Sequence, residues 1–371
     1  MEKKHNYGID LLRIFLMLLI ITGHLFVHTN NIRKDFPEFS SKWIFTWSYE
    51  AIIVCAVNCF VLITGYFSNN NNYTIRIKKI ALLWGQVLFY SIGIYFVLLL
   101  TGMIDFSIIE MIHSIFPVLS GQYWFFSSYI LLMLLMPFLN YMLSRLNDFG
   151  LKLLTAIIIF VFYILPTFSI IFLQFDLTEG MGIIGFVTLY IIGHALKRFE
   201  IQLSKFRCIL GICINCGVIV FSKFALTYIV NRLQLNVGTA LLYHYNSIFQ
   251  LINATLLLLL FKEIHLQGKI AKAVAFVGSS MFGVYLLHEH PQIRDVIWND
   301  RLYDVLVQST FLYYIALVLC LPILLFIVCL LLDKIRKWLG YLIAKTSLVR
   351  KMDSQLTILE DRLKNKFDGT C

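Results

Sequence analysis

Ten long apolar runs constrain the fold of this chain more than any other feature of its sequence. They lie at about residues 9–28, 46–67, 80–102, 123–143, 151–173, 181–197, 208–229, 244–262, 273–290 and 309–332. Each is long enough to cross a bilayer as a helix once tilt is allowed. The strands of a membrane β-barrel would instead alternate apolar and polar residues over about ten positions. The sequence therefore predicts an all-α, polytopic membrane protein, a bundle of about ten transmembrane helices.

The basic residues predict how this bundle is oriented. Of the 31 lysines and arginines, 23 fall in one set of loops and termini, six in the opposite set and two inside apolar runs. Because cytoplasmic loops carry the excess of positive charge, both termini are predicted to be cytoplasmic, in a multi-pass protein of the plasma membrane. The formal charge of +10 then reflects this asymmetry and attraction to anionic membrane lipids, so we expect no nucleic-acid partner.

Three segments of the chain have distinct patterns. The run at residues 9–28 follows Lys3 and Lys4 but is too long and too charged for a cleaved signal peptide, so we expect a retained first helix. Residues 103–122 are apolar but interrupted by polar groups, which favours a short interfacial or re-entrant helix. We divide the chain into an integral-membrane domain, 1–332, and a cytoplasmic amphipathic tail, 333–371, whose basic and aromatic residues suit a helix on the membrane surface.

The cysteines and one histidine pair offer little support for a metal or a disulfide framework. Seven of the eight cysteines lie inside apolar runs, where a cysteine acts as a small apolar side chain. Cys213 and Cys216 form a CxxC, but they lie in the middle of a predicted membrane helix. His288 and His290 flank a glutamate without the HExxH spacing of a zinc site. We expect no metal.

Among the ionisable residues of the first run are Asp10, Arg13 and His24. Such groups inside a span are costly and usually functional. Arg13 and His24 are eleven residues apart, about three helical turns, so they share one face at a separation of about 16 Å. Alone, Arg13 could snorkel to lipid phosphates and His24 could pack as an interhelical polar group. Together with Asp10, they favour a polar stripe that faces a lined cavity.

Six motifs along the chain, in order, resemble those of the integral-membrane acyltransferase-3 family, whose members O-acylate sugars and cell-surface polysaccharides. The first is IDLLR followed by ten residues and His24. The second and third depart slightly from the family pattern, because Thr64 replaces a serine and Lys79 replaces an arginine. The full set comprises residues 9–24, CFVLITGYF (59–67), RIKK (76–79), YWFFSSYILLMLLMPFLN (123–140), LYIIGHALKR (189–198) and SSMFGVYLLHEHP (279–291).

This resemblance covers about residues 5 to 330 and implies roles for residues at both ends of the membrane. A hydroxyl acceptor needs a general base, a role suited to histidine, and His24 is the first candidate. A covalent acyl-imidazole on His24 is a less favoured alternative. Arg13 would orient acyl-CoA or anchor the site, with Asp10 as its partner. His288 would assist at the acceptor side.

The donor and acceptor imply further candidates. Arg76, Lys78 and Lys79 would bind the phosphates of acetyl-CoA, the expected donor substrate, although positive-inside charge also explains them. Tyr285 is one turn from His288 and would orient it. Trp124 would stack on a sugar ring, although an aromatic belt explains it equally well. We expect the polar residues Asn58, His194, Lys223 and Asn253 to be structural.

The sequence thus predicts an O-acetyltransferase that moves an acetyl group from cytoplasmic acyl-CoA to a hydroxyl of a cell-surface polysaccharide or lipid-linked sugar. Direct transfer and an acyl-enzyme relay are both open. Two other classes are considered: a non-enzymatic flippase for lipid-linked oligosaccharide, and a polysaccharide polymerase. The flippase would favour two pseudo-symmetric halves, and no internal repeat is visible. The polymerase would favour large external loops, whereas the longest predicted here are about twenty residues.

Overall fold

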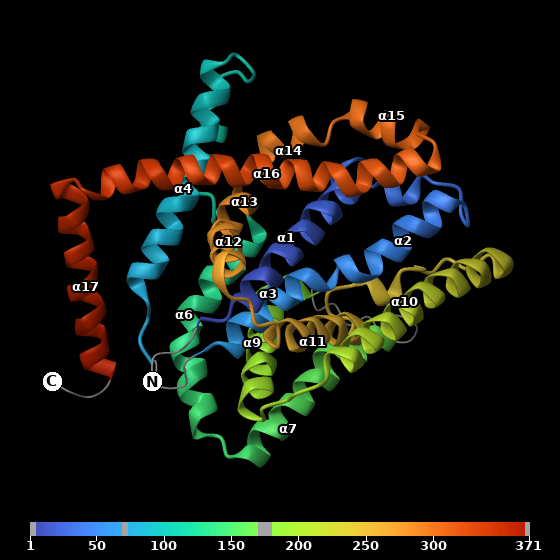
Figure 1. Cartoon of the computed structure of the whole chain (residues 1–371), viewed down its shortest axis with the longest axis horizontal. Helices are drawn as coiled ribbons and strands as arrows, with labels where there is room; N and C mark the ends of the chain where they lie inside the picture. Colours follow the sequence, from blue (N-terminus) through green and yellow to red (C-terminus); the bar gives the residue numbers. More distant parts are fainter. Residues whose placement is uncertain (1–4, 69–72, 170–179, 368–371) are drawn as a thin grey trace. The chain divides into compact units, whose positions relative to one another are not determined.

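A computed structural model describes residues 5–68, 73–169 and 180–367 (Figure 1). Lys3 and Lys4, the last residues of the predicted run 151–173, and Cys371 lie outside this range. Within it the chain is helical and contains no strand, which confirms the all-α prediction.

Each of the ten predicted runs coincides with helical structure. Eight helical segments of the described chain are long and apolar enough to cross a membrane: Tyr7–His28 (α1), Ser41–Tyr66 (α2, Ser41–Ile53, and α3, Cys55–Tyr66), Ile77–Leu100 (α4), Trp124–Arg145 (α6), Asp148–Phe168, Lys205–Leu233 (α10), Gly268–His288 (α12, Gly268–Gly278, and α13, Met281–His288) and Phe311–Ala344 (α16). The other two runs form shorter helices, α9 (Ile183–Arg198, 16 residues) and α11 (Ile248–Lys262, 15 residues). The chain is a multi-pass membrane protein.

The described helices group into two compact units that interleave in sequence. The first unit takes its helices from the ranges Met1–Ser68, Asn147–Met281 and Trp298–Phe326. The second takes them from Asn69–Leu146, Phe282–Ile297 and Ile327–Cys371. Besides α4 and α6, the second unit contains α5 (Ile108–Ile115), most of α13, α14 (Pro291–Ile297), the end of α16, and α17 (Ser347–Phe367).

Two glycines allow a close helix crossing in the first unit, where α3 packs against α9 (Figure 1). A Cβ atom at Gly65 would lie 2.2 Å from the carbonyl oxygen of Tyr190, and one at Gly193 would lie 2.4 Å from that of Leu62. Only glycine permits backbones to approach so closely, a common device in membrane helix pairs. Helix α11 packs on α3 and on α10, and α1 packs against α3, α11 and α12.

The residue that caps the start of α1, Asn6, also attaches this helix to α11. The Asn6 side chain accepts hydrogen bonds from the backbone N–H groups of Gly8 and Ile9, which satisfies donors that a helix start leaves unpaired. Its Nδ2 donates to the carbonyl oxygen of Lys262, at the end of α11, over 3.1 Å. The start of α1, where Asp10 and Arg13 lie, is therefore fixed within the first unit.

A proline distorts the span Asp148–Phe168. Helix α7 (Asp148–Ile159) runs into a π-helical turn, Phe160–Ile164, before α8 (Leu165–Ser169). Pro166 lies in α8; it lacks an N–H, and its ring crowds the carbonyl of Phe162 four residues earlier. The wider π turn relieves this conflict.

The second unit contains the predicted interfacial segment, 103–122, and the predicted tail, 333–371. In the predicted interfacial segment, α5 is only eight residues long and packs against α4. The Tyr95 hydroxyl of α4 donates to the carbonyl oxygen of Ser107 over 2.9 Å and fixes the start of α5. In the predicted tail, α16 continues as one helix past residue 333 to Ala344, and α17 then packs against α4. The separation of a tail domain at residue 333 stays a prediction.

Candidate active site

The start of α1 presents a buried carboxylate that holds an arginine. Asp10 is 6% exposed. Arg13 Nη1 donates to Asp10 Oδ1 over 3.0 Å, and His5 Nε2 lies 2.5 Å from Asp10 Oδ2. A Cβ on Gly278 of α12 would lie 3.1 Å from the Cβ of Asp10, so a larger residue there would crowd the carboxylate. The structure thus places Asp10 as the partner of Arg13.

The other end of α1 carries two neighbouring histidines. The ring of half-buried His24 lies with its centroid 5.0 Å from that of His28. Because α1 is continuous from Tyr7 to His28, Arg13 and His24 keep the separation of about 16 Å expected for eleven helical residues. A single continuous helix therefore fixes the positions of Arg13 and His24 relative to each other.

The end of α13 carries a fully buried histidine whose tautomer the structure defines. His288 is 0% exposed, and its Nδ1 lies 2.6 Å from the carbonyl oxygen of Val284. A carbonyl oxygen only accepts, so Nδ1 carries the proton. In the neutral ring Nε2 is then the nitrogen with the lone pair, the form that a general base requires.

An aromatic cluster at the start of α6 and in α13 adjoins this histidine through Tyr285. The Tyr285 ring lies with its centroid 6.2 Å from that of His288, 5.9 Å from Tyr123 and 5.8 Å from Phe125. Trp124 packs against Phe125 at 6.0 Å. Two sequence candidates, Tyr285 and His288, are therefore direct neighbours, and Trp124 lies in the same aromatic cluster of the second unit.

The predicted cationic cluster lies at the start of α4. Arg76 is the residue before the helix, and both Arg76 and Lys79 are exposed. Lys78 is held differently: its Nζ lies 2.7 Å from Asp353 of α17, and its backbone N–H donates to Glu360 over 3.1 Å. Two cations beside a helix N-terminus form a suitable site for phosphate.

The sequence candidates thus fall into two sets. The first unit holds Asp10, Arg13 and His24 on a single helix. The second unit holds the others, Arg76, Lys78, Lys79, Trp124, Tyr285 and His288.

Two buried carboxylates were missed by sequence reasoning. Asp333 of α16 is 0% exposed; it accepts hydrogen bonds from the Tyr90 hydroxyl and Arg336 Nε, both over 2.8 Å. Glu50 of α2 is 3% exposed and lies 2.6 Å from Arg33 Nη1. Their signal in the sequence was an acidic residue inside or at the end of an apolar run. Each has an arginine partner, which fits a structural role.

Polar residues that we predicted to be structural do link helices and loops. Asn58 donates to the carbonyl oxygen of Tyr245 over 2.7 Å, and Asn253 donates to that of Ala51 over 3.3 Å. Lys223 Nζ lies 2.6 Å from the Thr239 hydroxyl and 4.1 Å from the centre of the Trp47 ring. These contacts satisfy the polar groups inside the first unit.

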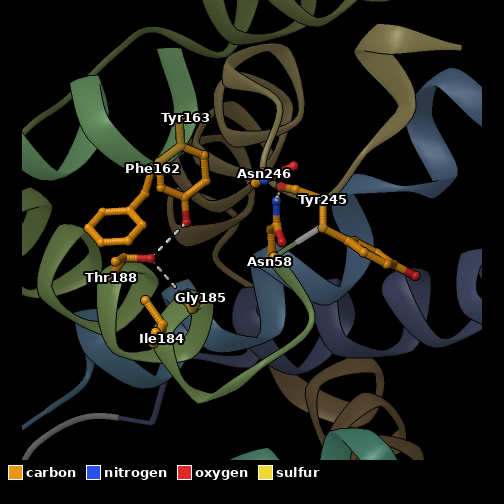
Figure 2. A pocket seen from close by; sticks show the side chains of 9 residues that line it. Asn58, Phe162, Tyr163, Ile184, Gly185, Thr188, Tyr245 and Asn246 are labelled. Atoms are coloured by element: carbon orange, nitrogen blue, oxygen red, sulfur yellow. Dashed lines mark hydrogen bonds between the residues drawn. The ribbon is translucent and has the colours of Figure 1, made fainter. Parts of the chain in front are cut away.

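Figure 2 shows a small pocket of the first unit between the π-helical turn, α3 and α9. Its polar groups bond to one another: the Tyr163 hydroxyl lies 3.1 Å from that of Thr188, and Asn58 donates to Tyr245. The lining contains no histidine, carboxylate or amine. This composition offers no acid–base chemistry, so we assign the pocket no role in the reaction.

The fold and the buried polar residues define a class: a multi-pass helical membrane protein with ionisable side chains inside its helices. A family model described as an acyltransferase domain matches residues 6–334. The chain therefore belongs to the integral-membrane acyltransferase-3 family. No curated protein and no solved structure shows significant similarity to it. Membership favours an acyltransferase over the flippase and the polymerase.

Proposed function

We propose that the protein is an O-acetyltransferase of the plasma membrane. It takes the acetyl group from acetyl-CoA on the cytoplasmic side and transfers it to a hydroxyl of a cell-surface polysaccharide or lipid-linked sugar. The family supports acyl transfer in general. The observation that carries the proposal is the pair Arg13 and His24 on α1, with Arg13 held by buried Asp10.

The donor is bound, in this proposal, through its phosphates. Arg76 and Lys79 are exposed at the start of α4, where helix N–H groups and cations favour an anion. Positive-inside orientation places this loop on the cytoplasmic side, where acyl-CoA is found. Arg13 supplies a further positive charge, whose direction is set by its ion pair with Asp10.

The reaction is a direct acyl transfer. His24 removes the proton of the acceptor hydroxyl as its oxygen attacks the thioester carbonyl carbon. The new carbon–oxygen bond forms, the carbon–sulfur bond breaks, and the CoA thiolate leaves with a proton. His288, with its lone pair on Nε2, assists at the acceptor side by accepting a hydrogen bond from the sugar. An acyl-imidazole on His24 would split the same transfer into two steps.

The test uses the full-length protein in sealed vesicles of known orientation. Radiolabelled acetyl-CoA is supplied on the side of the termini, and label in the glycan is measured. We expect wild type to label the glycan and His24→Ala to abolish labelling. The matched control is His113→Ala, because His113 is an exposed histidine of α5. Full labelling by His24→Ala at equal protein level would overturn the assignment of the base.

The proposed donor site at the start of α4 is tested through the KM for acetyl-CoA. Arg76→Ala removes one exposed cation at the start of α4, so the apparent KM for acetyl-CoA rises while kcat changes little. The control is Arg362→Ala, which removes an exposed cation of α17. An effect confined to the KM of the glycan would contradict the role of Arg76.

A further inference from the structure

The last part of α16 carries a charged segment, residues 333–337, that the proposed reaction does not use. It contains one carboxylate, Asp333, and three cations, Lys334, Arg336 and Lys337. The segment therefore has a formal charge of +2. Its own carboxylate neutralises only one of the three cations, so the segment has positive charge to spare for an anion from outside.

Asp333 is the fixed centre of this segment. It is 0% exposed, and its Oδ1 accepts hydrogen bonds from the Tyr90 hydroxyl of α4 and from Arg336 Nε, both over 2.8 Å. Its Oδ2 lies 3.6 Å from Lys337 Nζ. A Cβ atom on Gly283 of α13 would overlap Oδ1, so glycine is required there. Three helices of the second unit thus fix one carboxylate, and this carboxylate holds two cations in place.

Both cations also reach the surface of the second unit. The side chains of Arg336 and Lys337 are 18% and 34% exposed. Arg336 uses Nε for Asp333, and a guanidinium has further N–H donors on its two Nη atoms. Such a group can bind two oxygens of a phosphate at once, and a neighbouring ammonium adds a point charge. The two side chains can therefore bind a phosphate that approaches from outside the unit.

The position of the segment along α16 indicates where such a phosphate lies. Residues 311–332 contain no charged side chain. As a helix they are about 33 Å long, close to the hydrocarbon thickness of about 30 Å. Asp333 follows directly, so the charged segment lies at the level of the lipid headgroups. Trp338 and Tyr341, 61% and 62% exposed, come next, and such aromatic side chains are typical of the membrane–water interface.

The side chains that follow Asp333 form a stripe on one face of α16. The spacing of three to four residues along a helix places Lys334, Lys337, Trp338 and Tyr341 on this face. Lys345, just after the helix, lies with Nζ 4.2 Å from the centre of the Tyr341 ring. Positive-inside orientation explains lysines after a membrane helix, but it does not require a buried carboxylate that orients an arginine. The contacts of Asp333 therefore distinguish a built site from ordinary flanking charge.

We propose that Arg336 and Lys337 bind the phosphate of an anionic phospholipid at the end of α16. The exposed aromatic side chains beside the site, and its position directly after an uncharged helical stretch, favour a lipid over a soluble phosphate. The formal charge of +2 favours a headgroup with net negative charge over a zwitterionic one. This binding is independent of the proposed function, because it requires neither an acyl donor nor an acceptor.

The test counts the lipids that stay bound to the full-length protein in native mass spectrometry. Dioleoylphosphatidylglycerol or zwitterionic dioleoylphosphatidylcholine is added to protein in detergent. We expect wild type to prefer phosphatidylglycerol, and Lys337→Gln to bind it about fivefold more weakly, the contribution of one cation near an anionic surface. The control is Lys351→Gln, which removes an exposed cation of α17 and should bind as wild type does. Equal binding by wild type and Lys337→Gln would overturn the site.

Arg336→Lys separates a built site from diffuse attraction between charges. The variant keeps a cation beside Asp333, so we expect it to fold and to melt close to the temperature of wild type in phosphatidylcholine. It loses the guanidinium that binds two phosphate oxygens at once, so we expect most of the preference for phosphatidylglycerol to be lost. An unchanged preference in a folded Arg336→Lys protein would contradict the proposed site.

Acetyl-CoA is the other source of phosphate that the experiment examines. Its binding to wild type and to Lys337→Gln is measured in the same way, and we expect no difference between the two proteins. Weaker binding of acetyl-CoA with unchanged binding of phosphatidylglycerol would overturn the lipid site. A failure of acetyl transfer to glycan would leave the comparison of the two lipids unaffected, so the inference and the proposed function fail separately.

Discussion

The Nδ1 atom of His288 lies 2.6 Å from the carbonyl oxygen of Val284, four residues earlier in α13. This contact assigns the proton to Nδ1 and leaves the lone pair on Nε2. It also holds the ring in one rotamer in a position that is 0% exposed. Substitutions can therefore separate the contact that Nδ1 makes from the basicity of Nε2.

His288→Asn tests this division. An asparagine amide can donate to the Val284 carbonyl as Nδ1 does, but it has no basic nitrogen at the position of Nε2. We expect the protein to fold and kcat to fall about a hundredfold or more, the range for a lost acid–base group. Acetyl transfer and melting temperature are measured in the same detergent preparation. Wild-type kcat in His288→Asn would show that His288 is structural only.

Asp10→Asn tests the partner of Arg13. The change removes the charge that pairs with Arg13 Nη1 at 3.0 Å. Because the Arg13 side chain is 38% exposed, solvent screens the pair, and we expect a modest loss of stability of about 1 kcal/mol. Activity should fall more than stability, since Arg13 is no longer oriented. The control, Asp148→Asn, removes the partner of Arg198 at 2.9 Å, in a surface pair. Equal activity in the two variants would contradict a role for Asp10.

Asp353→Asn combined with Glu360→Gln tests the contact between α17 and the cationic cluster. Asp353 and Glu360 hold Lys78 through its amine and its backbone N–H. If this cluster binds the CoA phosphates, removing the competing carboxylates lowers the apparent KM for acetyl-CoA, most clearly at low salt. Asp361→Asn, an exposed acidic position of α17, is the control. A higher KM in the double variant would mean that α17 helps to bind the donor.

Gly193→Ala tests the α3–α9 crossing. The added Cβ would lie 2.4 Å from the Leu62 carbonyl oxygen, so the helices must separate. We expect a loss of about 1–3 kcal/mol, seen as a lower melting temperature in detergent. Gly93→Ala in α4 is the matched control, because a Cβ there meets nothing within 4 Å. Equal melting temperatures for the two variants would contradict the observed packing.

The membrane architecture could be predicted because apolar length is a local property of the sequence. Each of the ten runs coincides with a helix, and α5 is short, as the polar residues around it indicated. The π-helical turn before Pro166 and the close crossing at Gly65 and Gly193 were not predicted. They depend on which carbonyl lies opposite, and a single sequence does not contain that information.

The candidate site, too, could be predicted where its contacts are local in the sequence and not where they are distant. The pairing of Asp10 with Arg13 follows from a spacing of three residues within one helix, and Tyr285 lies one turn from His288. The meeting of Tyr285 with the start of α6 joins residues about 160 positions apart, a contact that no local pattern encodes. For the tail, basic and aromatic residues indicated a membrane surface, whereas α17 uses its acidic residues to contact α4.

The central claim is that this protein transfers an acetyl group to a glycan hydroxyl with His24 as the base. Its most direct test is the rate at which sealed vesicles move label from acetyl-CoA into glycan, for wild type and His24→Ala at equal protein level. We expect glycan labelling in wild type and none above background in His24→Ala. Equal labelling rates in the two proteins, or labelled acetate released to water with no labelled glycan, would contradict the claim.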